Sequence, residues 1–560
     1  MPTLSSSEAA APPAAWSRWL RRPVSAALIL LLIYVGLSFL NDPHGSLGTD
    51  TGGKVATLVA MDRNGDLDPD VGYWAGRFDP ETRVHGLYYT SKIGDRYLNV
   101  TSLPMVLAAS PLYDVGGYRL ALLLPMAGSI AAAFAARAIA RRVGRGDGWA
   151  AFWVIGLASP LAVYALDFWE HSIGVALMAW GAVALYDAVH DRPTWWRGLA
   201  AGAAFGAAFS MRTEALAYGF AMIATACLVL WIGRKNLAGG VLTGATAAVG
   251  VVALFMANAA LEIGVLGTTF RSGRTSGAAG SGGAELALRV KEAVVTSLSP
   301  VGSIGAEGFL FGIGLAAALG YLVWCSSRRR EPRLAVIAAV LVGFIYLYSF
   351  RGGPGFIPGL VATTPLAVAG VVLGWTRPRA RLFVAFALAP LPLVFYFQFP
   401  GGALPQWGGR YILTTGTILA AVGVACLPRL ELWVRRFLVT ASVAVTVFGL
   451  AWLSIRSHEV AQAADVLEAR PEAVLIQPQG FIAREFGATY GRKDWLSTGG
   501  AVDIPFAAQV AAESGAESMA LVDAATGRDP IELDGWTLQG SEIVHLDLAD
   551  FRVTTYTRTP

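Results

Sequence analysis

The chain has 560 residues, of which 55% are hydrophobic and 15% charged, and its mean hydropathy is +0.53. A soluble protein of this length carries nearer a quarter charged residues, so this composition is typical of a membrane protein. The net charge of +4 is small and is spread over short arginine clusters, which argues against a nucleic-acid partner. Cys227, Cys325 and Cys426 lie in apolar segments without paired spacing, so neither a disulfide framework nor a zinc site is predicted.

The first apolar segment is Val24–Leu40, and Arg18, Arg21 and Arg22 precede it. Positive charge beside the first segment favours a cytoplasmic start, so residues 1–23 are expected to form a cytoplasmic tail. No clear small-residue cleavage site follows, and we interpret the segment as a retained anchor. Asp50 then emerges on the outer face close to the bilayer surface, within the glycine-rich stretch 48–54, which we expect to be a turn.

Further segments of roughly 17–25 apolar residues recur along the chain, together with some shorter ones. The expected spans after the first are Leu120–Ala140, Trp149–Leu166, Ile173–Tyr186, Leu199–Met211, Ala215–Ile232, Leu237–Leu261, Phe309–Cys325, Leu334–Phe350, Val361–Trp375, Leu382–Phe397, Ile412–Leu427 and Phe437–Leu453. Alternate connections are rich in arginine, at positions 137–145, 192–197, 234–235, 328–333, 377–381 and 429–436. All of these lie on the cytoplasmic side if there are about thirteen transmembrane helices. The sequence thus predicts a polytopic α-helical membrane domain over residues 24–455.

Three large pieces are expected on the outer face: the loop 41–103, the middle loop 262–308 and the tail 456–560. The loop 41–103 contains a helix-compatible run at Val55–Met61, and Leu103–Leu112 is expected to be a short interfacial helix. In the tail 456–560, apolar runs rich in β-formers alternate with helical patterns, which is typical of a small α/β domain. These runs are Ala473–Ile476, Met519–Val522, Ile543–Leu548 and Phe551–Tyr556, and the helical patterns are Glu459–Ala469 and Ile504–Ala512.

Charged groups at the outer ends of the predicted helices are the candidates for chemistry, because charges in or beside membrane segments are costly and often functional. Asp50, with Lys54 one helical turn away, is the candidate general base. The other candidates are Asp167, Glu170, His171, Arg212, Arg351, Arg410 and Tyr411. A general base with several cations suits a phosphate-bearing substrate. Structural alternatives are a buried Arg212–Glu214 pair, Arg351 as an interfacial anchor, and His171 as a helix cap.

The pattern resembles the GT-C superfamily of membrane glycosyltransferases, which use polyprenyl-phosphate sugars. The resemblance rests on Asp50 early in the first outer loop, the interfacial helices of that loop, the acidic pair Asp167 and Glu170, and Arg410–Tyr411 before a late helix. It implies that Asp50 is the catalytic base and that basic residues bind the donor phosphate. Tyr89 and Lys92 resemble a Tyr/Lys pair of some bacterial members. Asp50 is followed by Thr51 where many members have a second acid, which leaves metal dependence and the subfamily open.

From these observations we expect a GT-C-like fold and a glycosyltransferase of the multi-pass plasma membrane, with its site on the extracytoplasmic face. It would move a sugar from a polyprenyl-phosphate donor to a hydroxyl of a glycan, lipid or protein acceptor. A single base predicts inversion at C1, whereas retention would need a second carboxylate, for which Glu170 is available. No cofactor is assigned, and a divalent metal stays possible. The alternatives are an O-antigen-type polymerase or ligase and a lipid-linked glycan transporter.

Overall fold

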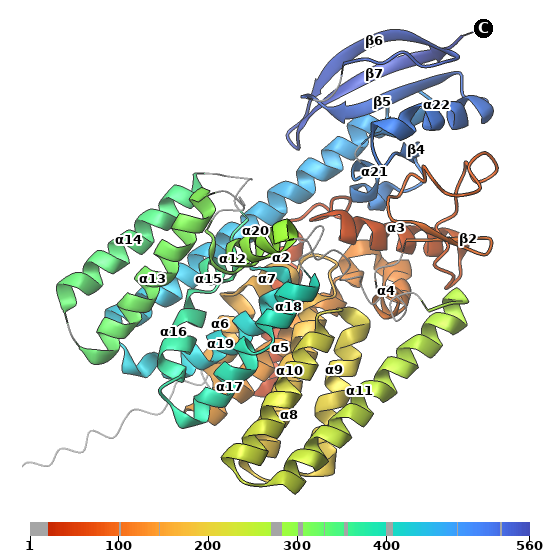
Figure 1. Cartoon of the computed structure of the whole chain (residues 1–560). Coiled ribbons are helices and arrows are strands. Elements are labelled where there is room, and N and C mark those ends of the chain that lie inside the picture. Colours follow the sequence, from red (N-terminus) through yellow and green to blue (C-terminus); the bar gives the residue numbers. More distant parts are fainter. Residues whose placement is uncertain are drawn as a thin grey trace, which may run out of the picture.

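The computed structural model describes residues 21–99, 102–144, 146–269, 283–300, 306–329, 331–351, 357–398, 407–478, 480–526 and 529–559. Figure 1 shows a body of helices from which one long helix, α20 (Leu432–Glu468), leads to a sheet-containing domain at the C-terminus. α20 runs through position 456, where the outer domain was expected to begin, without interruption. The membrane part and the outer domain are therefore joined by a continuous helix.

Nine helices in the described part of the chain are long and apolar enough to cross a membrane. They are Leu123–Val143, His171–His190, Ala215–Gly233, Leu237–Leu266, Glu307–Arg328, Pro332–Phe350, Pro378–Phe397, Arg410–Arg429 and Leu432–Glu468. The first expected span is the shorter helix α2 (Pro23–Ser38), and the fifth is α9 (Trp195–Met211). A polytopic α-helical architecture is thus confirmed, whereas the count of thirteen is not.

Several expected spans are broken helices. Residues 149–166 form α6 (Trp149–Leu157) and α7 (Pro160–Tyr164), and residues 361–375 form α15 (Leu360–Thr363) and α16 (Pro365–Gly374). Both breaks come directly before a proline, because proline disfavours the helical conformation of the residue that precedes it. The remaining helices of this part of the chain are α5 (Leu123–Val143), α8 (His171–His190), α10 (Ala215–Leu228) with the π-turn η1 (Val229–Gly233), α11 (Leu237–Leu266), α13 (Ala306–Arg328), α14 (Pro332–Phe350), α17 (Pro378–Leu388), α18 (Leu391–Gln398), η3 (Arg410–Ile412), α19 (Leu413–Cys426) and η4 (Leu427–Arg429). The stretch expected to be the middle outer loop contains one further helix, α12 (Gly283–Leu298), which is not among the candidate spans.

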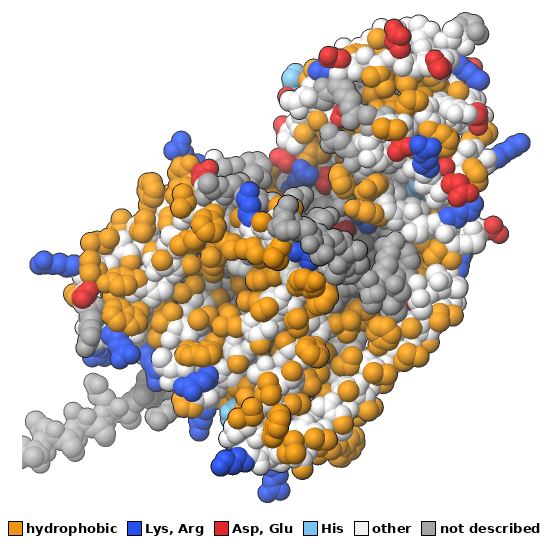
Figure 2. Space-filling view, in the orientation of Figure 1, with side chains coloured by type: hydrophobic (Ala, Val, Ile, Leu, Met, Phe, Trp, Pro, Cys, Tyr) orange, Lys and Arg blue, Asp and Glu red, His pale blue; other side chains and the backbone are white. Residues whose placement is uncertain are grey.

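The outer surface of the helical body is apolar. Val249, Val252 and Met256 of α11 are each more than half exposed, as are Val340 and Leu347 of α14. Figure 2 shows hydrophobic side chains covering the helical body, whereas most acidic side chains in view lie on the C-terminal domain. An apolar surface of this extent is unfavourable in water and suits contact with lipid.

The first outer loop is built around a helix that begins earlier than its sequence predicts. α3 (Thr49–Asn64) places Asp50 in its first turn, so the expected glycine-rich turn around Asp50 is wrong. A short hairpin follows, with β1 (Ser91–Ile93) paired antiparallel to β2 (Arg96–Leu98). The predicted interfacial helix Leu103–Leu112 is longer, α4 (Leu103–Ala121), and it is kinked at Gly116 and Gly117.

The C-terminal domain is an α/β domain, as predicted. Its five-stranded sheet has the order β4-β3-β5-β7-β6, in which the first three strands are parallel and the last two pairings are antiparallel. The strands are β3 (Val474–Gln477), β4 (Asp494–Ser497), β5 (Ser518–Ala524), β6 (Trp536–His545) and β7 (Asp550–Arg558), with α21 (Ile482–Glu485), η5 (Gly487–Thr489) and α22 (Ile504–Glu513) between them. β4 was not predicted, and β6 begins before the expected run Ile543–Leu548 and ends within it.

Glycines let the C-terminal domain approach α3 very closely. A Cβ atom at Gly52 would lie 1.9 Å from the carbonyl oxygen of Arg484, and one at Gly487 would lie 1.8 Å from that of Gly52. A Cβ at Gly53 would meet the Asn99 side chain at 2.4 Å. These glycines therefore serve close packing of α21 and η5 against α3, rather than a flexible turn.

We predict that Gly52→Ala destabilises the protein although alanine favours a helix. The added methyl group collides with the α21 backbone, and such overpacking costs roughly 1–3 kcal/mol. Gly48→Ala is the matched control, because Gly48 has an extended φ of 172° and nothing within 4 Å of the added Cβ. The measurement is the apparent melting temperature in detergent. Equal melting of the two variants would contradict the close packing.

Candidate functional site

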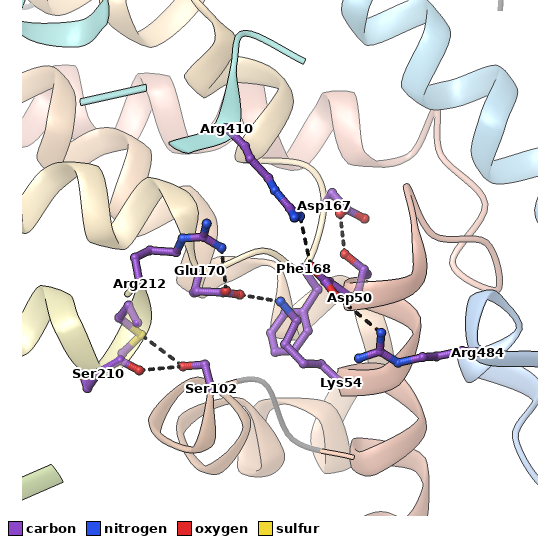
Figure 3. Close-up of polar contacts among 12 residues, drawn as sticks. Asp50, Lys54, Ser102, Asp167, Phe168, Glu170, Ser210, Arg212, Arg410 and Arg484 are labelled. Atoms are coloured by element: carbon purple, nitrogen blue, oxygen red, sulfur yellow. Dashed lines mark hydrogen bonds and ion pairs between the residues drawn. The ribbon is translucent and has the colours of Figure 1, made fainter. Parts of the chain in front are cut away.

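Asp50 lies between two arginines that come from distant parts of the chain (Figure 3). Arg410 Nη1 donates to Asp50 Oδ2 at 3.0 Å, and Arg484 Nη1 donates to Asp50 Oδ1 at 3.4 Å. The Asp50 side chain is 33% exposed, whereas those of Arg410 and Arg484 are 11% and 2% exposed. The Asp50 carboxylate is thus the most accessible of the three groups, and the two guanidinium groups are more deeply buried.

The charges around Asp50 set its protonation state. Burial alone would raise the pKa of this carboxyl, but attraction to Arg410, Arg484 and Lys54 outweighs burial and lowers the pKa below its ordinary value. Asp50 is therefore ionised at neutral pH and is in the form that can accept a proton.

A second group of charges lies directly beside the first. Lys54, whose side chain is fully buried, pairs with Glu170. Glu170 also accepts from Arg212 Nη1 at 3.3 Å, and Arg212 Nε donates to Glu214 at 2.9 Å. A buried lysine is costly unless it is paired, so Glu170 is held in place by two cations. The interpretation of Arg212 and Glu214 as a buried pair is confirmed. The pair belongs to a larger network that joins α3, the residue before α8 and the connection between α9 and α10.

Asp167 holds the backbone around the site. It accepts from the Thr51 hydroxyl at 2.6 Å, from the Tyr118 hydroxyl at 3.0 Å and from the Leu47 amide at 3.3 Å. Burial raises the pKa of Asp167, although these hydrogen bonds favour its ionised form. Because its oxygens are already hydrogen-bonded within the protein, Asp167 positions the start of α3 against the loop before α8.

Aromatic rings cover both arginines. Arg410 lies over the ring of Tyr411 at 4.6 Å and donates to its hydroxyl at 2.7 Å, and Arg212 lies 5.1 Å from the same ring. Arg484 lies 5.4 Å from the ring of Tyr89, which is 57% exposed. Tyr89 and Tyr411 therefore belong to the site.

Three candidates lie outside this cluster. Lys92 is exposed on β1 and donates to the Pro80 carbonyl. Arg351 is exposed at the end of α14, and no contact in the described structure joins it to Asp50 or Arg410. His171 is buried at the start of α8 and packs against Tyr164 and Trp169. These three roles stay predictions.

No pattern in the sequence singles out Arg484. It lies on the short helix α21 of the C-terminal domain, 434 residues from Asp50, and its Nε donates to Asn99 at 3.0 Å. The pairing depends on how two separate parts of the chain pack. A possible signal was the glycine pair Gly52–Gly53, which marks the close approach of another backbone to α3.

No group of three or more His, Cys, Asp or Glu side chains suited to a metal ion occurs among the described residues.

The solved structures to which this chain is similar include two kinds of protein. ArnT from Cupriavidus metallidurans, in its apo form, matches with 16% identity and a TM-score of 0.43, over 97% of this chain and 98% of that one. The oligosaccharyltransferase of Archaeoglobus fulgidus matches with 13% identity and a TM-score of 0.47, over 90% and 70%. No protein-family model and no curated protein matches the chain. These likenesses are too distant to identify a function, and we infer the function from the site itself.

We predict that Lys54→Met lowers stability markedly, because Glu170 loses one of its two cations in a buried place. Breaking a buried pair costs roughly 3–5 kcal/mol, and the Arg212 contact should keep the loss near the lower end. Lys92→Met, at an exposed lysine of the same loop, is the control. Melting curves of the two variants in detergent test this, and a Lys54→Met protein that melts like the control would contradict it.

Proposed function

We propose that this protein is a membrane glycosyltransferase that moves a sugar from a polyprenyl-phosphate donor to an acceptor hydroxyl. The observation that carries the proposal is Asp50, ionised and partly exposed, between the guanidinium groups of Arg410 and Arg484. A carboxylate supplies a base, and guanidinium groups bind phosphate through paired hydrogen bonds. The carboxylate thus suits proton removal from the acceptor, and the two guanidinium groups suit the phosphate of the donor.

The position of the site suits a lipid substrate. The spans Arg410–Arg429 and His171–His190 both begin beside it, and α9 ends beside it at Met211. Asp50 is therefore level with one end of the membrane helices, where lipid phosphates lie. A substrate can hold its phosphate at this level while its chain stays in the hydrocarbon.

An apolar groove lies near Arg410. It has a volume of about 400 Å³ and is lined by α12 and α18 residues such as Val290, Ala293 and Phe395. α12 reaches the site, because a Cβ at Gly409 would lie 2.9 Å from the carbonyl oxygen of Thr296. A prenyl chain that starts at Arg410 has this groove as a place to bind.

The chemistry follows from these positions. The acceptor oxygen attacks C1 of the sugar, the bond between C1 and the phosphate oxygen breaks, and Asp50 takes the acceptor proton. Arg410 and Arg484 stabilise the charge that develops on the departing polyprenyl phosphate. Glu170 is 2% exposed and already pairs with two cations, so it is a poor nucleophile. One available carboxylate favours inversion at C1.

We propose only the chemical class of the donor and the acceptor, and we identify neither the sugar nor the acceptor molecule. Among the matched structures, one of ArnT contains undecaprenyl phosphate, and one of the archaeal oligosaccharyltransferase AglB contains a dolichol-phosphate and an inhibitory peptide. For this chain we propose a polyprenyl phosphate of unspecified length as the donor carrier. The acceptor is a hydroxyl of a glycan, lipid or protein.

Asp50→Asn is predicted to lower kcat by roughly 10²–10⁴-fold, because the amide cannot accept the proton. Affinity for polyprenyl phosphate should be kept or increased, since the two arginines no longer share their charge with a carboxylate. Asp62→Asn on the exposed side of α3 is the control. An Asp50→Asn enzyme with turnover near that of the control would exclude Asp50 as the base.

Arg410→Ala and Arg484→Ala are each predicted to weaken polyprenyl-phosphate binding. Loss of one hydrogen bond to a charged group costs about 1.5–3 kcal/mol, which corresponds to roughly 10- to 150-fold in affinity. Arg492→Ala, at an exposed arginine of the C-terminal domain, is the control. Affinity is measured on the folded fraction together with melting temperature. Normal binding by a variant that melts early would show that the arginine only holds the domains together.

We propose that the site faces outward across the plasma membrane, because the arginine-rich connections lie at the opposite ends of the helices. A cysteine at the exposed Ser541 should then react with an impermeant thiol reagent on intact cells. A cysteine at the exposed Arg436 should react only after the membrane is permeabilised. The reverse pattern would contradict this orientation.

A further inference from the structure

A large cavity lies at the other end of the helical body from Asp50. It has a volume of about 780 Å³ and lies among the ends of α5, α6, α17 and α19. The stretch from Arg410 at the active site to Arg429 at this cavity is helical from end to end, and at about 1.5 Å per residue it is roughly 30 Å long. The cavity is thus on the opposite membrane face from the proposed catalytic site.

The cavity is positively charged. Arg377, Arg379 and Arg429 line it, together with one acidic residue, Asp147. Asp147 is already engaged, because it pairs with Arg21 at 3.2 Å and accepts from the Trp149 amide at 3.2 Å. Arg379 and Arg429 are exposed, and neither side chain forms a hydrogen bond or ion pair with any residue that the structure describes. Two cations therefore face the cavity without an anionic partner in the described chain.

Two helix N-termini add to this charge. α6 begins at Trp149 and α17 begins at Pro378, and residues of both first turns line the cavity, namely Ala150 and Ala151 of α6 and Pro378 and Arg379 of α17. The Trp149 amide is already bonded to Asp147 and Pro378 has no N–H, so what both helix ends offer an anion is mainly the partial positive charge of the helix dipole. The arginines and the helix ends thus attract the same kind of ligand.

The remaining walls are apolar, and they come from membrane helices. Val143, Ala151 and Val424 line the cavity, and α5 and α19 belong to membrane spans that end here. Trp375, 53% exposed, lies two residues before Arg377, and tryptophan is common at membrane interfaces. Phosphate groups of lipids lie at this level, with their acyl chains beside the apolar walls.

We propose that this cavity, lined by Arg377, Arg379 and Arg429, binds the phosphate headgroup of an anionic glycerophospholipid. Basic pockets between membrane helices on the cytoplasmic side suit such headgroups. Arginine is common in the cytoplasmic connections of membrane proteins because it determines their topology. The abundance of arginine on this face is therefore no evidence by itself for a bound lipid. Arg377, Arg379 and Arg429 differ from the other arginines of this face because they line a cavity. Variants of arginines inside and outside the cavity can therefore be compared.

The test measures binding of phosphatidylglycerol, phosphatidylcholine and inorganic phosphate to the purified full-length chain by native mass spectrometry. The double variant Arg379→Ala/Arg429→Ala removes the two exposed cavity cations. Arg333→Ala/Arg436→Ala is the matched control, because it removes two exposed arginines from the same arginine-rich face outside the cavity lining. A third variant, Ala150→Trp, fills the cavity at an exposed lining position and keeps every arginine.

We expect wild type and the control to bind phosphatidylglycerol at least about tenfold more tightly than phosphatidylcholine. The cavity double variant and Ala150→Trp should both lose this preference while melting normally. Equal losses in the control and the cavity double variant would mean diffuse surface attraction and would overturn the proposal. Full binding by Ala150→Trp would overturn it as well. Inorganic phosphate that binds with the same dependence on Arg379 and Arg429, without any preference for phosphatidylglycerol, would reassign the cavity to a free phosphate.

Discussion

The buried pair of Lys54 and Glu170 is the constraint on which the site depends. Lys54 lies on α3 in the first outer loop, Glu170 lies directly before α8, and neither side chain is exposed to more than a few per cent. An unpaired charge in such a buried place is costly. The pair therefore holds α3 and the start of α8 in one position relative to each other. Asp50 lies one helical turn before Lys54, so its position relative to the membrane helices is fixed by the same contact. The proposed base is thus positioned by a charge pair that need not take part in the proposed reaction.

Most residues of this site could be predicted from the sequence, whereas their arrangement in space could not. Hydropathy and arginine placement identified most of the membrane helices, because lipid contact leaves long apolar runs in the chain. They did not identify the breaks at Pro160 and Pro365, since the apolar composition continues across both. Asp50, Lys54, Glu170, Arg212, Arg410 and Tyr411 were selected as charged or aromatic residues at one membrane face, and they do come together. Arg351 satisfied the same criterion, and Lys92 was named from the family resemblance. No contact in the described part of the chain joins either of them to Asp50 or Arg410, because membrane depth alone does not determine which helix ends are neighbours.

Arg484 shows what local patterns cannot provide. It lies on a four-residue helix of the C-terminal domain, in a stretch that predicted no element, and it is among the largest fully buried side chains. Its approach to Asp50 requires the continuous helix α20 to carry the domain back over α3, and it requires glycine at positions 52 and 487. The C-terminal domain therefore supplies part of the site, and its sheet serves to hold α21 in place. Long-range packing of this kind leaves no periodic signal in the sequence.

The low pKa of Asp50 is at first sight unfavourable for a general base, because a strongly stabilised carboxylate accepts a proton less readily. The cause of the low pKa resolves this. Burial by itself raises the pKa of Asp50, and the arginines lower it by attraction. A donor phosphate bound to Arg410 and Arg484 would compensate the positive charge that now stabilises Asp50, and it would add negative charge nearby. Both changes raise the basicity of the carboxylate. On the proposed function, Asp50 becomes an effective base only when the donor is in place, so binding of the phosphate and activation of the acceptor hydroxyl are coupled through the same two arginines.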